Sequence, residues 1–193
     1  MASASTILVF GDSLSGAYGI RPEEGWVALL EQRLRSQGYG YQIVNASVSG
    51  ETSGGGLERL PRALELHHPG LVILELGAND ALRGLPLGAT QDNLAAMVRL
   101  SQSAGARVLL VGLRIPPNYG PRYTQQFASM FPALANQYHL PLVPFLLEKV
   151  ALDPERMQPD GLHPNAQGQP PIVDTVWPYL KALLNKNPQP GGS

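Results

Sequence analysis

The feature that most constrains the fold is an alternation of short aliphatic runs with longer segments of helical periodicity. Residues 7–10, 71–74 and 108–111 consist almost entirely of Ile, Leu, Val and Phe. A strand with one face in water alternates polar and apolar residues, so these runs indicate strands that are covered on both faces. The alternation is typical of βαβ units around a parallel sheet. We therefore expect an α/β fold with strands at about 6–10, 41–46, 70–76, 107–113 and 141–144.

Helices are expected between these strands. In the first helix, Trp26, Leu30 and Leu34 fall on one face. Thr90 is predicted to cap the N-terminus of the third helix, and Pro61 is predicted to kink or divide the second. The expected helical ranges are about 24–37, 53–66, 91–104, 123–138 and 168–185.

The composition favours one domain without an electrostatic partner. The 193 residues include 14 Lys and Arg against 15 Asp and Glu, and no segment concentrates basic residues, which argues against a nucleic-acid partner. The chain has no cysteine, which excludes disulfides, thiolate metal sites and a cysteine nucleophile. Its apolar runs are far shorter than the roughly 20 residues that span a bilayer, so stable membrane insertion is not expected. We expect one domain over residues 1–186 and a tail at 187–193 that is disordered or an expression remnant.

Glycine and polar residues follow the first three predicted strands directly. They occupy residues 11–15 (GDSLS), 47–52 (SVSGET) and 77–80 (GAND). In an open parallel sheet, ligands bind beyond the carboxyl ends of the strands. We therefore expect these three loops to gather at one edge of the sheet and to contain the functional site.

Ser13 is the candidate nucleophile, because its hydroxyl lies at that edge directly after an apolar strand. A serine hydroxyl needs a positioned base to take its proton. His163, in residues 160–164 (DGLHP), is the candidate base. Asp160 stands three residues earlier, where a tight turn lets it accept from one imidazole nitrogen while the other faces outward. Taken alone, this segment also fits an ordinary surface turn before a proline.

Gly50 and Asn79 are candidate donors to a negatively charged oxygen. The backbone N–H of a glycine is unobstructed, and an asparagine amide supplies a second donor, as acyl transfer requires. Each residue also has a simpler interpretation, Gly50 as a turn residue with positive φ and Asn79 as part of an Asx turn. Asp12 is expected to hold the loop by hydrogen bonds and not to be the acid of a triad.

These four segments together resemble the conserved blocks of the SGNH (GDSL) hydrolases in order and in spacing. Further short segments at 57–61, 118–120 and 157–160 are similar to the bacterial thioesterase I, lysophospholipase L1 and arylesterase subgroup. The resemblance implies a flavodoxin-like three-layer α/β/α sandwich with a central five-stranded parallel sheet. It departs from the subgroup where Ala78 replaces a glycine and where Gly16 and Ala17 stand in swapped order.

The resemblance also implies the roles of these residues. Ser13 would be the nucleophile, His163 the base and Asp160 the group that orients it, with an acyl-enzyme intermediate. The oxyanion hole would consist of the Ser13 and Gly50 amides and the Asn79 side chain. Substrate-binding residues carried over from the subgroup are Ala78, Asp80, Leu82, Ile115 and Pro116.

No cofactor and no metal are implied. The remaining histidines, His67, His68 and His139, do not fall at metal-ligand spacing, and we expect them at helix ends or in loops.

The predicted function is a serine esterase acting on carboxylic esters and acyl-thioesters, with arylesterase, thioesterase and lysophospholipase activity. Its expected partners are small ester or thioester substrates with an acyl or aryl group, and we expect a monomer. Two alternatives remain at this point: a carbohydrate O-deacetylase of the same superfamily, and a non-catalytic flavodoxin-like domain that binds a small ligand. The resemblance implies a periplasmic or secreted protein, although no signal peptide precedes the first strand.

Overall fold

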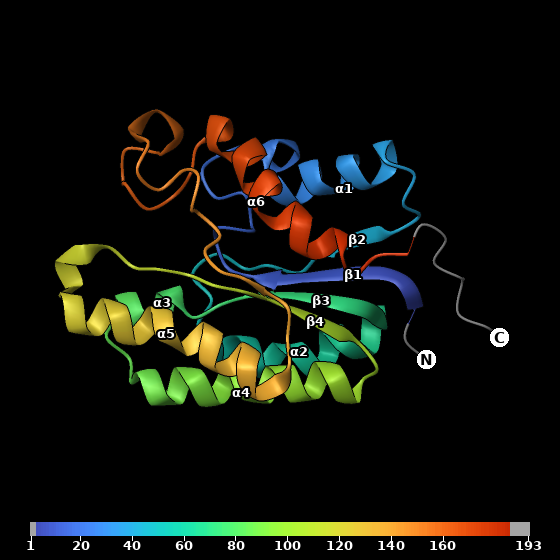
Figure 1. Ribbon diagram of the computed structural model, residues 1–193, viewed down its shortest axis with the longest axis horizontal. Helices are drawn as coiled ribbons and strands as arrows, with labels where there is room; N and C mark the ends of the chain where they lie inside the picture. The colour runs from blue at the N-terminus through green and yellow to red at the C-terminus, as the bar shows by residue number, and fades with distance from the viewer. Residues whose placement is uncertain (1–2, 186–193) are drawn as a thin grey trace.

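The protein is built around a five-stranded sheet, drawn in Figure 1. The computed structural model describes residues 3–185. The strand order is β2-β1-β3-β4-β5 and all neighbouring strands are parallel, which is the flavodoxin-like order. The predicted parallel sheet is confirmed. Its strands are β1 (Ser3–Gly11), β2 (Gln42–Asn45), β3 (Pro69–Glu75), β4 (Arg107–Val111) and β5 (Leu142–Val143).

Helices cover both faces of the sheet and give three layers. Helices α1 and α6 pack together on one face, and α2, α4 and α5 lie on the other, as Figure 1 shows. The predicted three-layer α/β/α sandwich is therefore confirmed. The helices are α1 (Trp26–Ser36), α2 (Ser53–His67), α3 (Ala78–Leu82), α4 (Leu87–Ser103), α5 (Pro121–Tyr138) and α6 (Gln169–Lys181).

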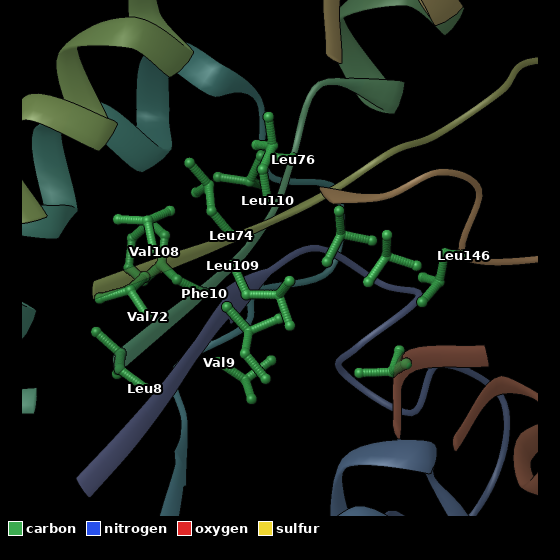
Figure 2. Packing of buried hydrophobic residues seen from close by; sticks show 14 of the residues in the cluster. Leu8, Val9, Phe10, Val72, Leu74, Leu76, Val108, Leu109, Leu110 and Leu146 are labelled. Atoms are coloured by element: carbon green, nitrogen blue, oxygen red, sulfur yellow. The ribbon is translucent and has the colours of Figure 1, made fainter. Parts of the chain in front are cut away.

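The core consists of strand residues packed between the two helical layers. Ile7, Leu8, Val9 and Phe10 of β1 have no exposed surface, and the aliphatic residues of β3 and β4 are buried to nearly the same degree. Figure 2 shows side chains of β1, β3 and β4 in contact with one another. Burial on both faces explains why the aliphatic runs are almost continuous in the sequence.

Two details of the predicted helices are wrong. Helix α4 begins at Leu87, so Thr90 lies inside it and does not cap it. The Thr90 hydroxyl oxygen instead lies 3.3 Å from the Pro86 carbonyl oxygen, one turn earlier, and 3.3 Å from Asp80 Oδ1, so the two acceptors share its one hydrogen. Helix α2 continues through Pro61 as one helix, so of the predicted kink or division the division does not occur.

Other boundaries differ less. Helix α3 was not expected, and α6 ends at Lys181, earlier than predicted. Among residues 3–185, the structure has no helix of the length and apolar character that crossing a membrane requires. The predicted tail at 187–193 lies outside the described residues, and the extent of the domain stays a prediction.

Candidate active site

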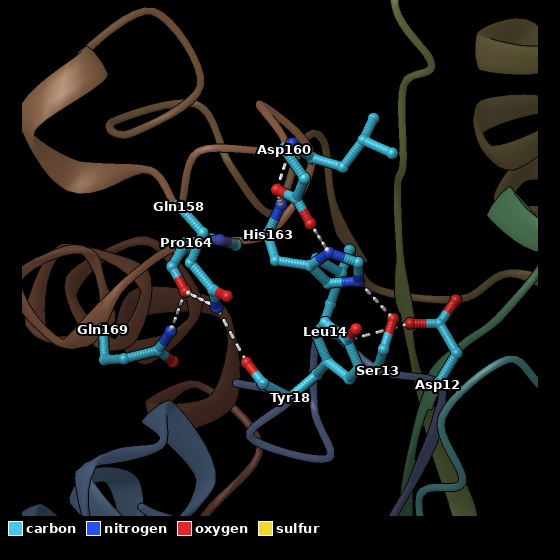
Figure 3. Close-up of polar contacts among 10 residues, drawn as sticks. Asp12, Ser13, Leu14, Tyr18, Gln158, Asp160, His163, Pro164 and Gln169 are labelled. Atoms are coloured by element: carbon cyan, nitrogen blue, oxygen red, sulfur yellow. Dashed lines mark hydrogen bonds and ion pairs between the residues drawn. The ribbon is translucent and has the colours of Figure 1, made fainter. Parts of the chain in front are cut away.

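Three side chains from two distant segments meet at the carboxyl edge of the sheet, as Figure 3 shows. Ser13 Oγ lies 2.8 Å from His163 Nε2, although 150 positions separate the two residues. His163 Nδ1 lies 2.6 Å from Asp160 Oδ2. The structure thus brings the predicted nucleophile, base and acid into one hydrogen-bonded chain.

Asp160 is held in place by its own turn. Its Oδ1 accepts hydrogen bonds from the backbone N–H of Leu162 at 2.9 Å and of His163 at 3.0 Å. Burial raises the pKa of Asp160, but hydrogen bonds from the His163 backbone, the His163 ring and the Leu162 backbone outweigh it and lower the pKa from 3.8 to about 2. Asp160 is therefore a carboxylate at neutral pH, able to accept from His163 Nδ1 and to fix which imidazole nitrogen faces Ser13.

The loop that carries Ser13 is fixed by contacts on both sides. Trp26 is fully buried, and its Nε1 donates to the Leu14 carbonyl at 3.1 Å. Glu75, at the end of β3, accepts a hydrogen bond from Ser15 Oγ at 2.7 Å. A side chain at Gly11 would place its Cβ 2.5 Å from Glu75 Oε2 and 2.9 Å from Ser15 Oγ, so glycine at this position leaves room for the hydrogen bond between them.

Gln158 joins the serine loop to the histidine loop. Its Nε2 donates to the Tyr18 carbonyl at 2.8 Å and to the Pro164 carbonyl at 3.1 Å (Figure 3). The Tyr18 ring lies against the His163 ring, with centroids 4.5 Å apart. Ala17, the residue before Tyr18, has a φ of 57°, in the left-handed region. The swapped order of Gly16 and Ala17 therefore places a side chain where glycine is favoured.

Gly50 and Asn79 are brought to the same edge. Gly50 has a φ of 79°, as predicted for a turn residue, and its carbonyl accepts a hydrogen bond from Arg83 Nη2 at 2.8 Å. Asn79 Nδ2 donates to the Glu51 carbonyl at 3.0 Å and to Asp12 Oδ2 at 3.2 Å. Asp12 also accepts from the Leu14 N–H at 3.0 Å, so its predicted role in holding the loop is confirmed.

The predicted substrate-binding residues divide into two groups. Ile115 and Pro116 line a groove of about 370 Å³ whose wall includes Leu162, the chain neighbour of His163. Ala78 and Leu82 pack against the core and do not line this groove. Asp80 is buried, and its carboxylate accepts from the Ser53 N–H at 2.8 Å and the Ser53 hydroxyl at 2.6 Å. Its contacts make Asp80 an anchor of α3 on α2, and its contact with substrate stays a prediction.

Sequence reasoning did not find most of the groove. Its further lining residues come from 145–152 and 157–162, which have no secondary structure with a readable period. Sequence reasoning also missed Tyr18 and Glu75. For Glu75 a signal existed, because a charged residue at the end of a strand covered on both faces needs a polar partner.

No set of three or more His, Cys, Asp or Glu side chains within residues 3–185 is arranged to hold a metal ion. His67 is the last residue of α2, and His68 and His139 cap the C-termini of α2 and α5, as the predicted helix-end roles required.

A serine hydroxyl bonded to an imidazole that is bonded to a carboxylate, at the carboxyl edge of a parallel sheet, is the arrangement of a serine hydrolase. Comparisons with known proteins agree. Esterase TesA of Pseudomonas aeruginosa is 51% identical over 183 residues, which are 95% of this chain and 91% of the relative. Thioesterase 1/protease 1/lysophospholipase L1 of Escherichia coli K12 is 43% identical over 184 residues, 95% of this chain and 87% of the relative.

A crystal structure of TesA, 51% identical, covers 93% of this chain and 99% of its own, with a TM-score of 0.91. The model of the GDSL-like lipase/acylhydrolase family matches residues 9–169. The chain therefore belongs to this family and is a hydrolase acting on ester bonds. The alternative of a non-catalytic binding domain is wrong.

Proposed function

We propose that Ser13 is the nucleophile of a two-step acyl transfer in which His163 is the general base and Asp160 orients it. The observation that carries this proposal is the 2.8 Å contact between Ser13 Oγ and His163 Nε2. As Ser13 Oγ attacks the substrate carbonyl, its proton passes to Nε2 and then to the leaving group. Water attacks the acyl-enzyme in the second step, with the same imidazole taking its proton.

The oxyanion of each tetrahedral intermediate would be held by the backbone N–H groups of Ser13 and Gly50 and by Asn79 Nδ2. Two contacts support this: Arg83 holds the Gly50 carbonyl, in the peptide that follows the donating Gly50 N–H, and the Glu51 carbonyl orients the Asn79 amide. Donors that are already oriented need no reorganisation when charge develops on the oxygen.

The substrate class we infer is esters and thioesters with an extended acyl or aryl group. The groove beside Leu162 is lined mainly by apolar side chains, among them Ile115, Phe145 and Met157. An apolar groove suits a hydrocarbon chain and offers a sugar few hydrogen-bond partners, which disfavours the O-deacetylase alternative. The names of the relatives support the same range of substrates, namely arylesters, thioesters and lysophospholipids.

A kinetic comparison tests the proposal. Wild type should hydrolyse p-nitrophenyl octanoate and octanoyl-CoA, whereas Ser13→Ala should be inactive and Asn79→Ala should lose about 10²–10³ in kcat. Asp174→Asn, an exposed carboxylate on α6 paired with Arg33, serves as the control and should retain wild-type rates. Equal activity of Ser13→Ala and wild type would contradict the proposal. Faster turnover of acetylated sugars than of octanoyl esters would favour the O-deacetylase.

We also infer a periplasmic location, a role in lipid metabolism and a monomeric state, by similarity to the subgroup. Fractionation of the native host with an antibody to this protein tests the location. Sedimentation velocity tests the monomer, for which a single species near the 20.7 kDa chain mass is expected.

A further inference from the structure

Two buried carboxyl groups lie directly beneath the nucleophile loop, and the acyl-transfer steps above use neither. Glu75 has no exposed surface and Asp12 has 1%. Glu75 Oε2 accepts hydrogen bonds from Ser15 Oγ at 2.7 Å and from the Asp12 N–H at 3.3 Å. Within the described part of the chain, no donor reaches the other oxygen, Glu75 Oε1. An ionised carboxylate in this position would be costly, because one buried oxygen would carry charge without a partner.

The side chain of Asp12 also interacts with that of Glu75, and a hydrogen bond between two carboxyl groups requires a proton on one of them. Burial and the neighbouring Asp12 raise the pKa of Glu75 well above 4.5. Burial raises the pKa of Asp12 from 3.8 to about 6, against the opposing effect of hydrogen bonds from Leu14 and Glu75. The charge of His163 lowers the pKa of Asp12, and the charge of Asp80 raises it. The proton fits Glu75, whose Oε1 has no donor, and the charge fits Asp12, whose oxygens accept from the Leu14 N–H and Asn79 Nδ2.

Asp12 connects this pair to the candidate oxyanion hole. Its Oδ2 accepts from Asn79 Nδ2 at 3.2 Å, and the Glu51 carbonyl accepts from the same nitrogen at 3.0 Å. Both partners of the Asn79 amide are acceptors, so the amide must present its nitrogen to them. If the amide rotated by half a turn, its oxygen would face a carboxylate and a carbonyl. Asp12 and the Glu51 carbonyl thus fix the orientation of Asn79.

We propose that Glu75 and Asp12 form a positioning pair for the oxyanion hole, in which Glu75 donates a hydrogen bond to the Asp12 carboxylate and Asp12 holds the Asn79 amide with its N–H groups ready to donate. Asp12 occupies one of these N–H groups in the free enzyme and yields it to the oxyanion. The inference rests on the proposed oxyanion role of Asn79 and extends it to two residues that do not touch substrate.

A double-mutant cycle tests the connection from Asp12 to Asn79. In Asp12→Asn an amide nitrogen or a weaker acceptor faces Asn79 Nδ2, so kcat on p-nitrophenyl octanoate should fall by about 10²–10³ with KM within threefold, as for loss of an oxyanion donor. Because Asp12 acts through Asn79, the double variant with Asn79→Ala should be within about threefold of Asn79→Ala alone. Asp174→Asn is the matched control.

This cycle distinguishes failure of the oxyanion assignment from failure of the positioning pair. Full activity of Asn79→Ala would overturn the oxyanion assignment itself. A loss in Asn79→Ala that multiplies with the loss in Asp12→Asn would overturn the positioning pair and leave the oxyanion assignment intact.

Substitutions of Glu75 test its role through the pH profile of kcat, which would not change if Glu75 had only a structural role. Glu75→Gln keeps an acceptor for Ser15 and a donor for Asp12, so kcat and the acid limb of its pH profile should match wild type. Glu75→Met removes that donor, so its kcat should fall and its acid limb should move to higher pH, because Asp12 loses a bond that favours its charged form. Equal behaviour of the two variants would overturn the proposal. A shift of the acid limb to lower pH in Glu75→Gln would also overturn the proposal, because it would show that Glu75 is charged in the wild type. If Glu75→Met does not fold, the Glu75→Gln profile decides.

Discussion

The buried Asp12 carboxylate predicts an unusual dependence of stability on pH. Its pKa is about 6 in the folded protein, against an ordinary value of 3.8, so the folded state binds more protons between these values. Stability should therefore rise as pH falls through 6. The full effect, below pH 3.8, is on the order of 3 kcal/mol at 1.36 kcal/mol per pH unit. On going from pH 7.5 to pH 5, Asp12 should add about 1.4 kcal/mol to the free energy of unfolding. Glu75, whose pKa is also raised, should increase it further.

Urea unfolding of wild type and Asp12→Asn at both pH values isolates this contribution, since other titrating groups largely cancel in the comparison. Wild type should gain at least about 1 kcal/mol more than Asp12→Asn on going from pH 7.5 to pH 5. Asp160 does not interfere, because its lowered pKa gives stability that is present above pH 3.8 and lost as pH falls through about 2. An identical change in the two proteins, or a smaller gain in wild type, would refute the assignment of a buried Asp12 carboxylate.

Three further substitutions test other parts of the site. Ala17→Gly should raise the free energy of unfolding by up to about 1 kcal/mol, because it removes a Cβ at a φ of 57°; a lower melting temperature would contradict this. Gln158→Glu places a carboxylate without a donor against the Tyr18 and Pro164 carbonyls and should lower kcat/KM about tenfold or more. The control Gln102→Glu, on the exposed side of α4, should not lower it. Equal rates of the two variants would disprove the link between the loops. Met157→Trp should obstruct the groove and slow hydrolysis of p-nitrophenyl palmitate much more than of the acetate, and an unchanged ratio would remove Met157 from the acyl path.

Much of the fold followed from the sequence because burial on both faces leaves a clear pattern. The aliphatic run of residues 7–10 marks β1, and the same pattern marks β3 and β4. The start of α4 was not predictable from a capping rule, because the Thr90 hydroxyl bonds to Asp80, a residue of another helix. Tertiary contacts of this kind decide helix boundaries without leaving a local signal.

The candidate site was predictable to the extent that single residues carry its chemistry. Ser13, Asp160 and His163 could be named because nucleophile, acid and base require those residue types. Of the groove, Ile115 and Pro116 could be carried over from the subgroup, but the rest of its wall could not be predicted, because it comes from irregular segments that only the folded chain brings together. The burial of Asp80 against Ser53 could not be predicted either, because the two residues are 27 positions apart in the chain.

Covalent labelling of the nucleophile tests the central claim most directly. Wild type should react with one equivalent of a p-nitrophenyl alkylphosphonate, lose activity in proportion, and carry the added mass on the peptide that contains Ser13. Ser13→Ala should remain unlabelled, and His163→Ala should label far more slowly because no base takes the Ser13 proton. Stoichiometric labelling at another residue, or equal labelling of Ser13→Ala, would contradict the account.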